Sequence, residues 1–170
     1  MMLTIIVSVI VLIIILLLAS YVLNSGETII TKQVIINSRQ DTVFDFAADM
    51  RNELKWNPDV QSMELLTTEP IGKGTVFLAK WSLSKKIQVE IIHYDRPHSL
   101  IFKNGGPLEV RLELNFSMQQ NQTQMATKFI AQPHGFLRVI FPLLKRKLSS
   151  QESMNMVNFK KELEGNHAIK

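Results

Sequence analysis

Hydrophobic and polar positions alternate without exception along one segment, LEVRLELNFSM at residues 108–118. Its even-numbered positions are apolar and its odd-numbered positions are polar, which is typical of a β-strand with one buried face and one face in water. Runs rich in Ile, Val and Thr, bounded by turn residues, predict further strands at 28–37, 60–68, 75–81, 87–95, 99–103 and 123–131. The connections between these runs are short, so we expect neighbouring strands to pair antiparallel in a curled sheet.

Helical patterns flank this set of strands. Ser38 is a candidate N-cap with Asp41 as its capping-box partner, which predicts a short helix, and Pro58 should end a second helical turn near 51–54. Near the end of the chain, apolar residues recur three, four or eight positions apart, which predicts one long helix with Pro142 either at a kink or at its start. Only this helix is able to cover the apolar face of the sheet, and a gap between the two is a natural place for a pocket.

The first segment, LTIIVSVIVLIIILLLASYVL at residues 3–23, has no charged side chain. As a helix it would be about 31 Å long, close to the thickness of the hydrocarbon core of a bilayer. A cleaved signal peptide would show a basic start, a shorter apolar run and a small-residue cleavage site, and this segment has none of them. We therefore expect a single-pass anchor and short linker at 1–26, a domain at 27–165 and a tail at 166–170. The first basic residues, Lys32 and Arg39, follow the anchor, which favours a cytoplasmic domain.

The net charge of +4 is concentrated at the end of the chain, because residues 1–136 hold 12 basic and 12 acidic side chains while residues 137–170 hold 7 basic and 3 acidic. The run Lys145–Lys147 belongs to this excess, and it is either a solvated helix face or a contact with an anionic membrane surface.

There is no cysteine, and the four histidines lack metal-ligand spacing, so we expect no disulfide, metal or other cofactor. The basic run is not interleaved with aromatic residues, so nucleic acid is not an expected partner.

Four polar or aromatic residues are candidates for chemistry. His93 shares the strand phase of Ile91 and is either a satisfied core residue or a ligand contact. Glu152 interrupts the apolar stripe of the last helix; it is either exposed near a pocket mouth, or buried, where it would need a partner or a proton. Trp81 is in phase with the apolar positions before it and is a core residue or a pocket wall. Trp56 is either a packing plug between helix and strand or part of a pocket entrance.

Several motifs together resemble one family. VIINSRQDTVFDFAADMRNELKWNPDV at 34–60, PIGKGT at 70–75, IIHYDRPHSLIF at 91–102 and FKKELEG at 159–165 resemble, in order and spacing, the START-like (SRPBCC) superfamily in its polyketide cyclase/dehydrase and lipid-transport branch. The resemblance covers residues 28–165. It implies an α+β helix-grip fold, in which a curved antiparallel sheet of six or seven strands wraps around the long last helix and encloses an apolar cavity. Members bind lipids, sterols, quinones or polyketides, and because they share no catalytic set, no catalytic residue is carried over.

The favoured hypothesis is a membrane-anchored module that holds a hydrophobic ligand, such as a lipid, a quinone or a polyketide-like molecule, between the sheet and the last helix. The residues expected to line this site are Trp56, Phe77, Trp81, Val89, Ile91, His93, Phe102, Leu112, Leu114, Leu148 and Met156. One alternative is a cyclase or dehydratase with His93 or Glu152 as acid or base. Another is a membrane-bound interaction or stress-response module without a ligand.

Overall fold

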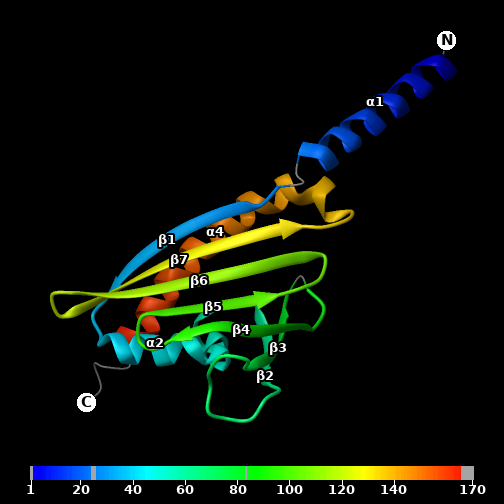
Figure 1. The fold of residues 1–170 in the computed structure, drawn as a ribbon. Coiled ribbons are helices and arrows are strands. Elements are labelled where there is room, and N and C mark those ends of the chain that lie inside the picture. Colours follow the sequence, from blue (N-terminus) through cyan, green and yellow to red (C-terminus); the bar gives the residue numbers. More distant parts are fainter. Residues whose placement is uncertain (1, 24–25, 83, 166–170) are drawn as a thin grey trace.

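The computed structural model describes residues 2–23, 26–82 and 84–165, and the predicted tail at 166–170 lies outside these residues. One long helix precedes the sheet, three short helical elements follow the first strand, and another long helix ends the described chain (Figure 1). In chain order the elements are α1 (Met2–Leu23), β1 (Thr28–Ile36), α2 (Gln40–Ala48), η1 (Met50–Asn52), α3 (Glu53–Trp56), β2 (Val60–Leu65), β3 (Val76–Trp81), β4 (Ile87–Asp95), β5 (Ser99–Asn104), β6 (Leu108–Gln119), β7 (Gln122–Pro133) and α4 (Leu137–Gly165).

The seven strands form one antiparallel sheet in the order β1-β7-β6-β5-β4-β3-β2. The longest strands, β6 and β7, pair along their full length and form the hairpin that projects farthest from α1 (Figure 1). In β6 the predicted alternation is confirmed at Leu114 and Phe116, which are buried, whereas Met118 near the hairpin tip is 51% exposed. The first and last strands of the series, β1 and β7, are neighbours, so the chain returns to its starting edge before α4 begins.

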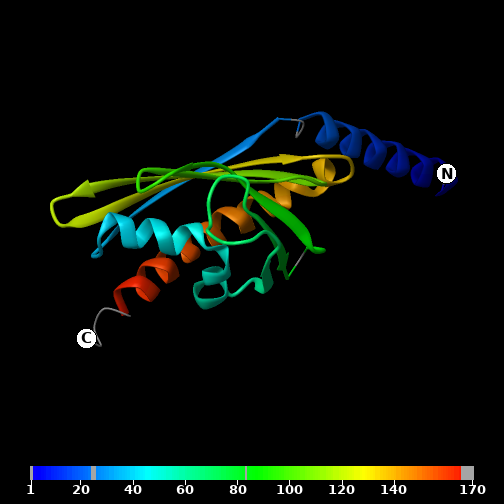
Figure 2. The same ribbon diagram turned by 60° about the horizontal axis from the view of Figure 1, so that its bottom comes forward.

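Helices α2 and α4 cover the same face of the sheet (Figure 2). The second half of α4 packs into the core through Met156, Phe159 and Leu163, which are buried and three or four positions apart, the spacing of a single helix face. Pro142 lies inside α4, so the helix begins before this proline and not at it. The expected curved sheet with a long C-terminal helix against one face is therefore confirmed.

Two polar contacts tie the end of α4 to the edge of the sheet. Lys160 Nζ donates a hydrogen bond to the carbonyl oxygen of Ile35 at 2.6 Å. The backbone N–H of Asn37 donates to Glu164 Oε1 at 2.8 Å. An edge strand has unpaired backbone groups, and these two contacts satisfy part of that edge while they fix α4 across β1.

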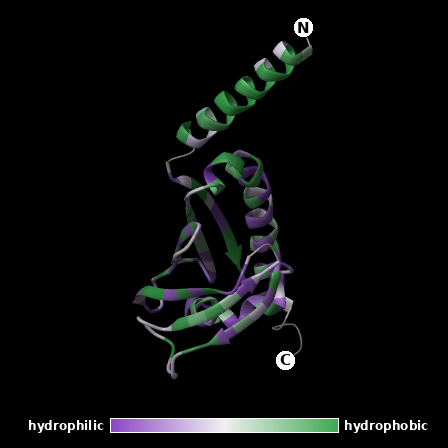
Figure 3. Ribbon diagram, turned by 90° about the vertical axis from the view of Figure 1, so that its right-hand side faces the viewer, coloured by the Kyte–Doolittle hydropathy of each residue, from purple (hydrophilic) through white to green (hydrophobic). Residues whose placement is uncertain are grey.

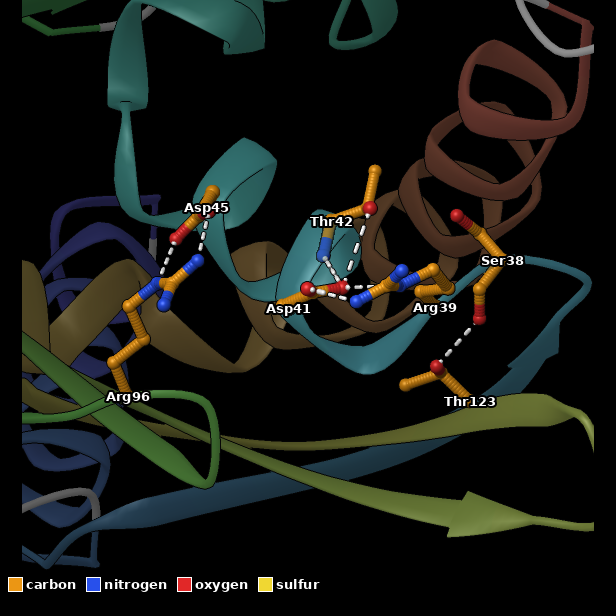
Figure 4. Close-up of polar contacts among 7 residues, drawn as sticks. All are labelled: Ser38, Arg39, Asp41, Thr42, Asp45, Arg96 and Thr123. Carbon is orange, nitrogen blue, oxygen red and sulfur yellow. Dashed lines mark hydrogen bonds and ion pairs between the residues drawn. The ribbon is translucent and has the colours of Figure 1, made fainter.

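The predicted capping of α2 is wrong. Arg39, not Ser38, is at the N-cap position, and its side chain makes no capping hydrogen bond. Asp41 instead accepts hydrogen bonds from the Arg39 guanidinium at 2.8 Å and from the Thr42 N–H at 2.9 Å (Figure 4). Ser38 is kept in the strand-to-helix corner by the sheet, because its carbonyl oxygen accepts a 2.7 Å hydrogen bond from the buried hydroxyl of Thr123.

A bidentate ion pair joins α2 to the turn after β4. Arg96 donates to both carboxylate oxygens of Asp45, at 2.6 and 2.7 Å (Figure 4). Both side chains are about half exposed, with relative accessibilities of 49% and 51%. Exposed pairs of this kind contribute little to stability, so the pair orients α2 more than it stabilises the fold.

Helix α1 projects away from the sheet and is apolar along nearly its whole length (Figure 3). It has no buried residue, and it is long and apolar enough to cross a membrane, a test that a signal sequence also passes. Its last turn contacts the start of α4. Ser20 Oγ donates to the carbonyl oxygen of Val139 at 2.8 Å, and the Arg138 guanidinium lies over the ring of Tyr21 at 5.1 Å.

Candidate functional site

The inner face of the sheet is not buried evenly. Near α2, inward side chains such as Ile36, Leu100 and Met125 are fully buried. Between the middle of the sheet and α4, inward side chains of both keep part of their surface accessible. We call this set the open middle; it comprises Lys32, Trp81, Leu112 and Phe129 of the sheet and Leu148 and Glu152 of α4. Solvent, or a bound molecule, can therefore reach the interior at this place.

The curl of the sheet brings distant strands to this place. Glu152 of α4 interacts electrostatically with Lys32 of β1 and with Glu53 of α3, and Glu53 is hydrogen-bonded to Trp81 of β3. Four strands separate β1 from β3 in the sheet order. A flat sheet would keep them far apart, so the shared contact with α4 follows from the curvature.

Glu152 of the open middle and Glu53 of the adjoining α3 form an acid pair. Glu53 Oε2 accepts a hydrogen bond from Asn57 Nδ2 at 3.3 Å, and the side chain of Asn155, one helical turn beyond Glu152, is hydrogen-bonded to Glu152. Burial raises the pKa of Glu53 to about 7 and that of Glu152 also to about 7. Both side chains nevertheless keep some accessible surface, which is expected of groups that line a recess and not the outer surface.

Charged and polar neighbours act on both acids. The Lys32 ammonium lowers the pKa of Glu152 against the larger effect of its burial; hydrogen bonds from Trp81 and Asn57 lower the pKa of Glu53 in the same way, while a charge on Glu152 raises it. Because both pKa values are about 7, one carboxyl group of the pair can carry a charge while the other keeps its proton. Near neutral pH the pair can both donate and accept a hydrogen bond, which suits the polar end of an otherwise apolar molecule.

Several buried polar atoms lack a hydrogen-bond partner among the described residues. They include Thr127 Oγ1 on the inner face of β7 and Asn155 Oδ1 on α4, together with Trp56 Nε1 and Ser62 Oγ. Thr127 lies directly opposite Lys32 on β1 and Leu114 on β6, so it belongs to the row of residues that faces α4. Buried polar groups are normally paired, so these atoms are the ones that a water molecule or a ligand would pair with if it entered here.

Nine of the eleven residues predicted to line the site fall into two groups in the structure. Packed in the core are Phe77, Val89, Ile91, Phe102, Leu114 and Met156, all at most 9% exposed. Trp81, Leu112 and Leu148 are half-buried in the open middle. The second group is better placed to touch a ligand, because its side chains keep accessible surface.

The predicted inward orientation of His93 is wrong. A register shift between Ile91 and His93 in the pairing of β4 with β5 reverses the phase of the strand, as a β-bulge does. His93 is exposed, and its Nε2 lies 2.7 Å from Ser99 Oγ, while Tyr94 takes the inward position and packs against Phe44. His93 and Glu152 are thus on different sides of the sheet.

Sequence reasoning missed Glu53. It stands in a polar stretch, NELKW, with no periodicity that points inward. Its environment depends on α3 lying against α4 and β2, which brings it to Glu152 and to Trp81 of β3. The nearest signal in the sequence is Trp56, three residues away on the same short helix.

Two open hollows lie elsewhere. One runs along α1, and the other, about 520 Å³ in volume, lies between the β5–β6 turn and the start of α4, lined by Gly106, Pro107, His134, Gly135, Phe136 and Leu137. Neither is between the sheet and the middle of α4, so the enclosed apolar cavity stays a prediction. Among the described residues there is also no cluster of acidic or histidine side chains suited to a metal ion.

Comparison with known proteins identifies the architecture. No family model matches the sequence, and no curated protein matches it. A START superfamily protein from Mycobacterium smegmatis superposes with a TM-score of 0.67 at 10% identity, over 82% of this chain and 99% of that one. The chain has the START-like helix-grip fold.

Two further solved structures share the helix-grip fold. A protein from Thermus thermophilus matches with a TM-score of 0.66 at 14% identity, over 84% of this chain and all of that one. The di-domain ARO/CYC BexL from the BE-7585A biosynthetic pathway matches with a TM-score of 0.63 at 14% identity, over 81% of this chain. This match spans only half of BexL. For the Mycobacterium and Thermus proteins, the match accounts for all or nearly all of the other chain.

Proposed function

We propose that this helix-grip protein is a membrane-anchored module that binds a hydrophobic molecule between its sheet and α4. The observation that carries the proposal is the open middle, a set of inward side chains that keep accessible surface and that includes the apolar Leu112 and Leu148 as well as Glu152, whose carboxyl group interacts with that of Glu53. The fold is shared with a START superfamily protein and with ARO/CYC proteins, which supports a ligand-binding role. α1 would hold the site beside the bilayer from which an apolar ligand can partition.

Burial of apolar surface supplies enough free energy for a hydrophobic ligand to bind. A ligand that buries about 300 Å² of apolar surface gains roughly 7 kcal/mol before association costs are subtracted. The free energy that remains after association costs corresponds to weak or moderate binding. We therefore expect the polar contacts to decide which ligand is bound. The protonated carboxyl group of the pair Glu53 and Glu152 would donate a hydrogen bond to a carbonyl or hydroxyl oxygen, and the ionised one would accept a hydrogen bond from a hydroxyl group.

The test is to purify the full chain in mild detergent and identify bound molecules by native mass spectrometry and lipidomics. Leu112→Trp would fill the open middle, while Leu66→Trp, at a site that is 48% exposed, is the matched control. We expect a bound apolar molecule in the natural protein and in Leu66→Trp and its loss in Leu112→Trp. Absence of any bound molecule, or equal retention in both variants, would overturn the proposal. Partner proteins retained by Leu112→Trp would favour the interaction-module alternative instead.

The acid pair also supports a second candidate function, proton transfer of the cyclase or dehydratase type. A carboxyl group with a pKa near the working pH is suited to general acid–base catalysis. In this case Glu53→Gln and Glu152→Gln would retain the bound molecule identified above but stop its conversion, followed by mass spectrometry. If the molecule is recovered unchanged from the natural protein after incubation, the binding role stands without catalysis.

A further inference from the structure

The start of α4 lies at the end of α1. Ser20 and Tyr21, in the last turn of α1, contact Val139 and Arg138 through a 2.8 Å hydrogen bond and a 5.1 Å cation–π contact. If α1 spans a bilayer, its last turn is where the chain leaves the hydrocarbon. The first turns of α4 are then held at the level of the lipid headgroups.

The outer surface of this part of α4 is both apolar and basic. Phe136, just before the helix, is 73% exposed, and Leu143 is 80% exposed. Arg146 and Lys147 follow Leu143 at three and four positions, so they lie on the same helix face, and both are exposed. We call these four residues the basal surface.

The charges of the basal surface are not neutralised within the protein. The segment 137–151 contains no Asp or Glu. Neither Arg146 nor Lys147 takes part in an ion pair among the described residues. Farther along α4, Lys160 and Glu164 do form an ion pair, with each other. Large exposed apolar side chains beside unpaired cations are the features that allow a helix to lie in a membrane interface.

We propose that the basal surface is a second membrane contact, which binds anionic lipid headgroups through Arg146 and Lys147 and inserts Phe136 and Leu143 among the lipids. The inference rests on the proposed anchoring by α1, which places this surface next to the bilayer, and on charge complementarity with an anionic leaflet. Each basic residue near such a surface strengthens binding about fivefold. Because α1 already keeps the surface close, this gain acts on orientation: it would hold the first turns of α4 at the membrane, with the rest of the helix rising away from it, and fix where the open middle faces.

The experiment uses the full chain, which has no natural cysteine. Leu143→Cys and, as the matched control, Val157→Cys are labelled with an environment-sensitive fluorophore. Val157 is 64% exposed and lies 14 positions later on nearly the same face of α4, about 21 Å farther from the membrane end. Each protein is reconstituted into vesicles of phosphatidylcholine alone or mixed with phosphatidylglycerol. Brominated lipids then quench any label that enters the bilayer.

In anionic vesicles we expect a blue-shifted emission and strong lipid quenching at position 143, and a label in water at position 157. The shift at 143 should weaken in phosphatidylcholine alone, at high salt, and in the Arg146→Glu/Lys147→Glu variant. A label at position 143 that stays in water overturns the proposal. Lipid quenching that is the same in both vesicle compositions and in the Arg146→Glu/Lys147→Glu variant overturns the role of anionic lipid. Shielding from aqueous quenchers without quenching by lipid would indicate a protein contact and also overturn it. Failure of α1 to anchor the protein gives a different result from failure of the basal surface to contact lipid. Without anchoring, the protein would not float with vesicles of either composition.

Discussion

The indole ring of Trp56 packs edge-on against the ring of Phe159, with ring centroids 5.4 Å apart and an angle of 80° between the planes. Phe159 makes a second edge-on contact, with Phe46 of α2, also at 5.4 Å. One aromatic residue of α4 thus joins the short helices on both sides of η1. Trp56, which the sequence presented as either a plug or an entrance residue, is half-buried and packs against the core in the way that a plug does.

Replacing Trp56 should therefore destabilise the fold. We expect Trp56→Ala to lower the free energy of unfolding by about 3 kcal/mol, because it removes the aromatic contact and leaves a void beside Phe159. Leu54→Ala, two residues away at a site that is 50% exposed, should change it little. Urea unfolding of the full chain in mild detergent, followed by circular dichroism, measures both. Equal midpoints for the two variants would contradict the plug.

The acid pair predicts how stability depends on pH. Glu53 and Glu152 have folded-state pKa values of about 7, above the ordinary value of 4.5, so the folded protein binds more protons than the unfolded chain between these limits. Stability from these groups is full below pH 4.5 and decreases as the pH rises through 7, by about 3 kcal/mol for each acid. Glu53→Gln should reduce this slope and stabilise the protein at about pH 8, above the folded-state pKa.

The control for the pH prediction is Glu90→Gln, since Glu90 is exposed on the outer side of β4. The test is to measure the midpoint of urea unfolding at several values from about pH 4 to about pH 9, a range that brackets both pKa values. A slope in Glu53→Gln as steep as in the natural protein would show that Glu53 is not desolvated in solution.

Two buried threonines on β7 should respond differently to the same change. Thr123 Oγ1 donates to the Ser38 carbonyl oxygen at 2.7 Å, whereas Thr127 Oγ1 has no partner among the described residues. Thr123→Val removes this donor from the carbonyl oxygen and should cost about 1–2 kcal/mol, while Thr127→Val should be nearly neutral. Unfolding midpoints test both. A large cost for Thr127→Val would instead reveal a bound water or ligand at its hydroxyl.

His93 should be dispensable for ligand binding. It lies on the outer side of the sheet, so His93→Ala should leave the amount and identity of co-purified molecules unchanged, as judged by native mass spectrometry. Leu148→Trp, from the half-buried part of α4, should reduce them, because the new side chain would occupy the open middle. Loss of bound molecules in His93→Ala alone would indicate that they bind on the outer face instead.

Regular patterns predicted the architecture well. The alternation around Leu114 and the spacing of Phe159 and Leu163 reflect strand and helix periods that the backbone imposes, so the sheet, its antiparallel pairing and the covering helix could be foreseen. The bulge before His93 could not, because one extra residue in a strand leaves the composition unchanged and reverses every later side chain.

The site was harder to predict than the fold. Glu152 stood out because it broke an apolar stripe, but nothing local marked Glu53. Its role depends on contacts with Trp81 and Glu152, which are distant in sequence and meet only after the sheet has curled. Likewise, the backbone around Ser38 follows the sheet through Thr123, and a capping preference worth about 1 kcal/mol was not decisive there.

The short distance along the chain between α1 and the sheet limits the reach of the domain. α1 ends at Leu23 and β1 begins at Thr28, so four residues join them, and even fully extended they span only about 14 Å. With α1 in a bilayer, the start of β1 stays within that radius of the point where the helix emerges. The domain would then stay at a fixed distance from one membrane. A hydrophobic molecule destined for another membrane would need a separate carrier protein to take it from this domain.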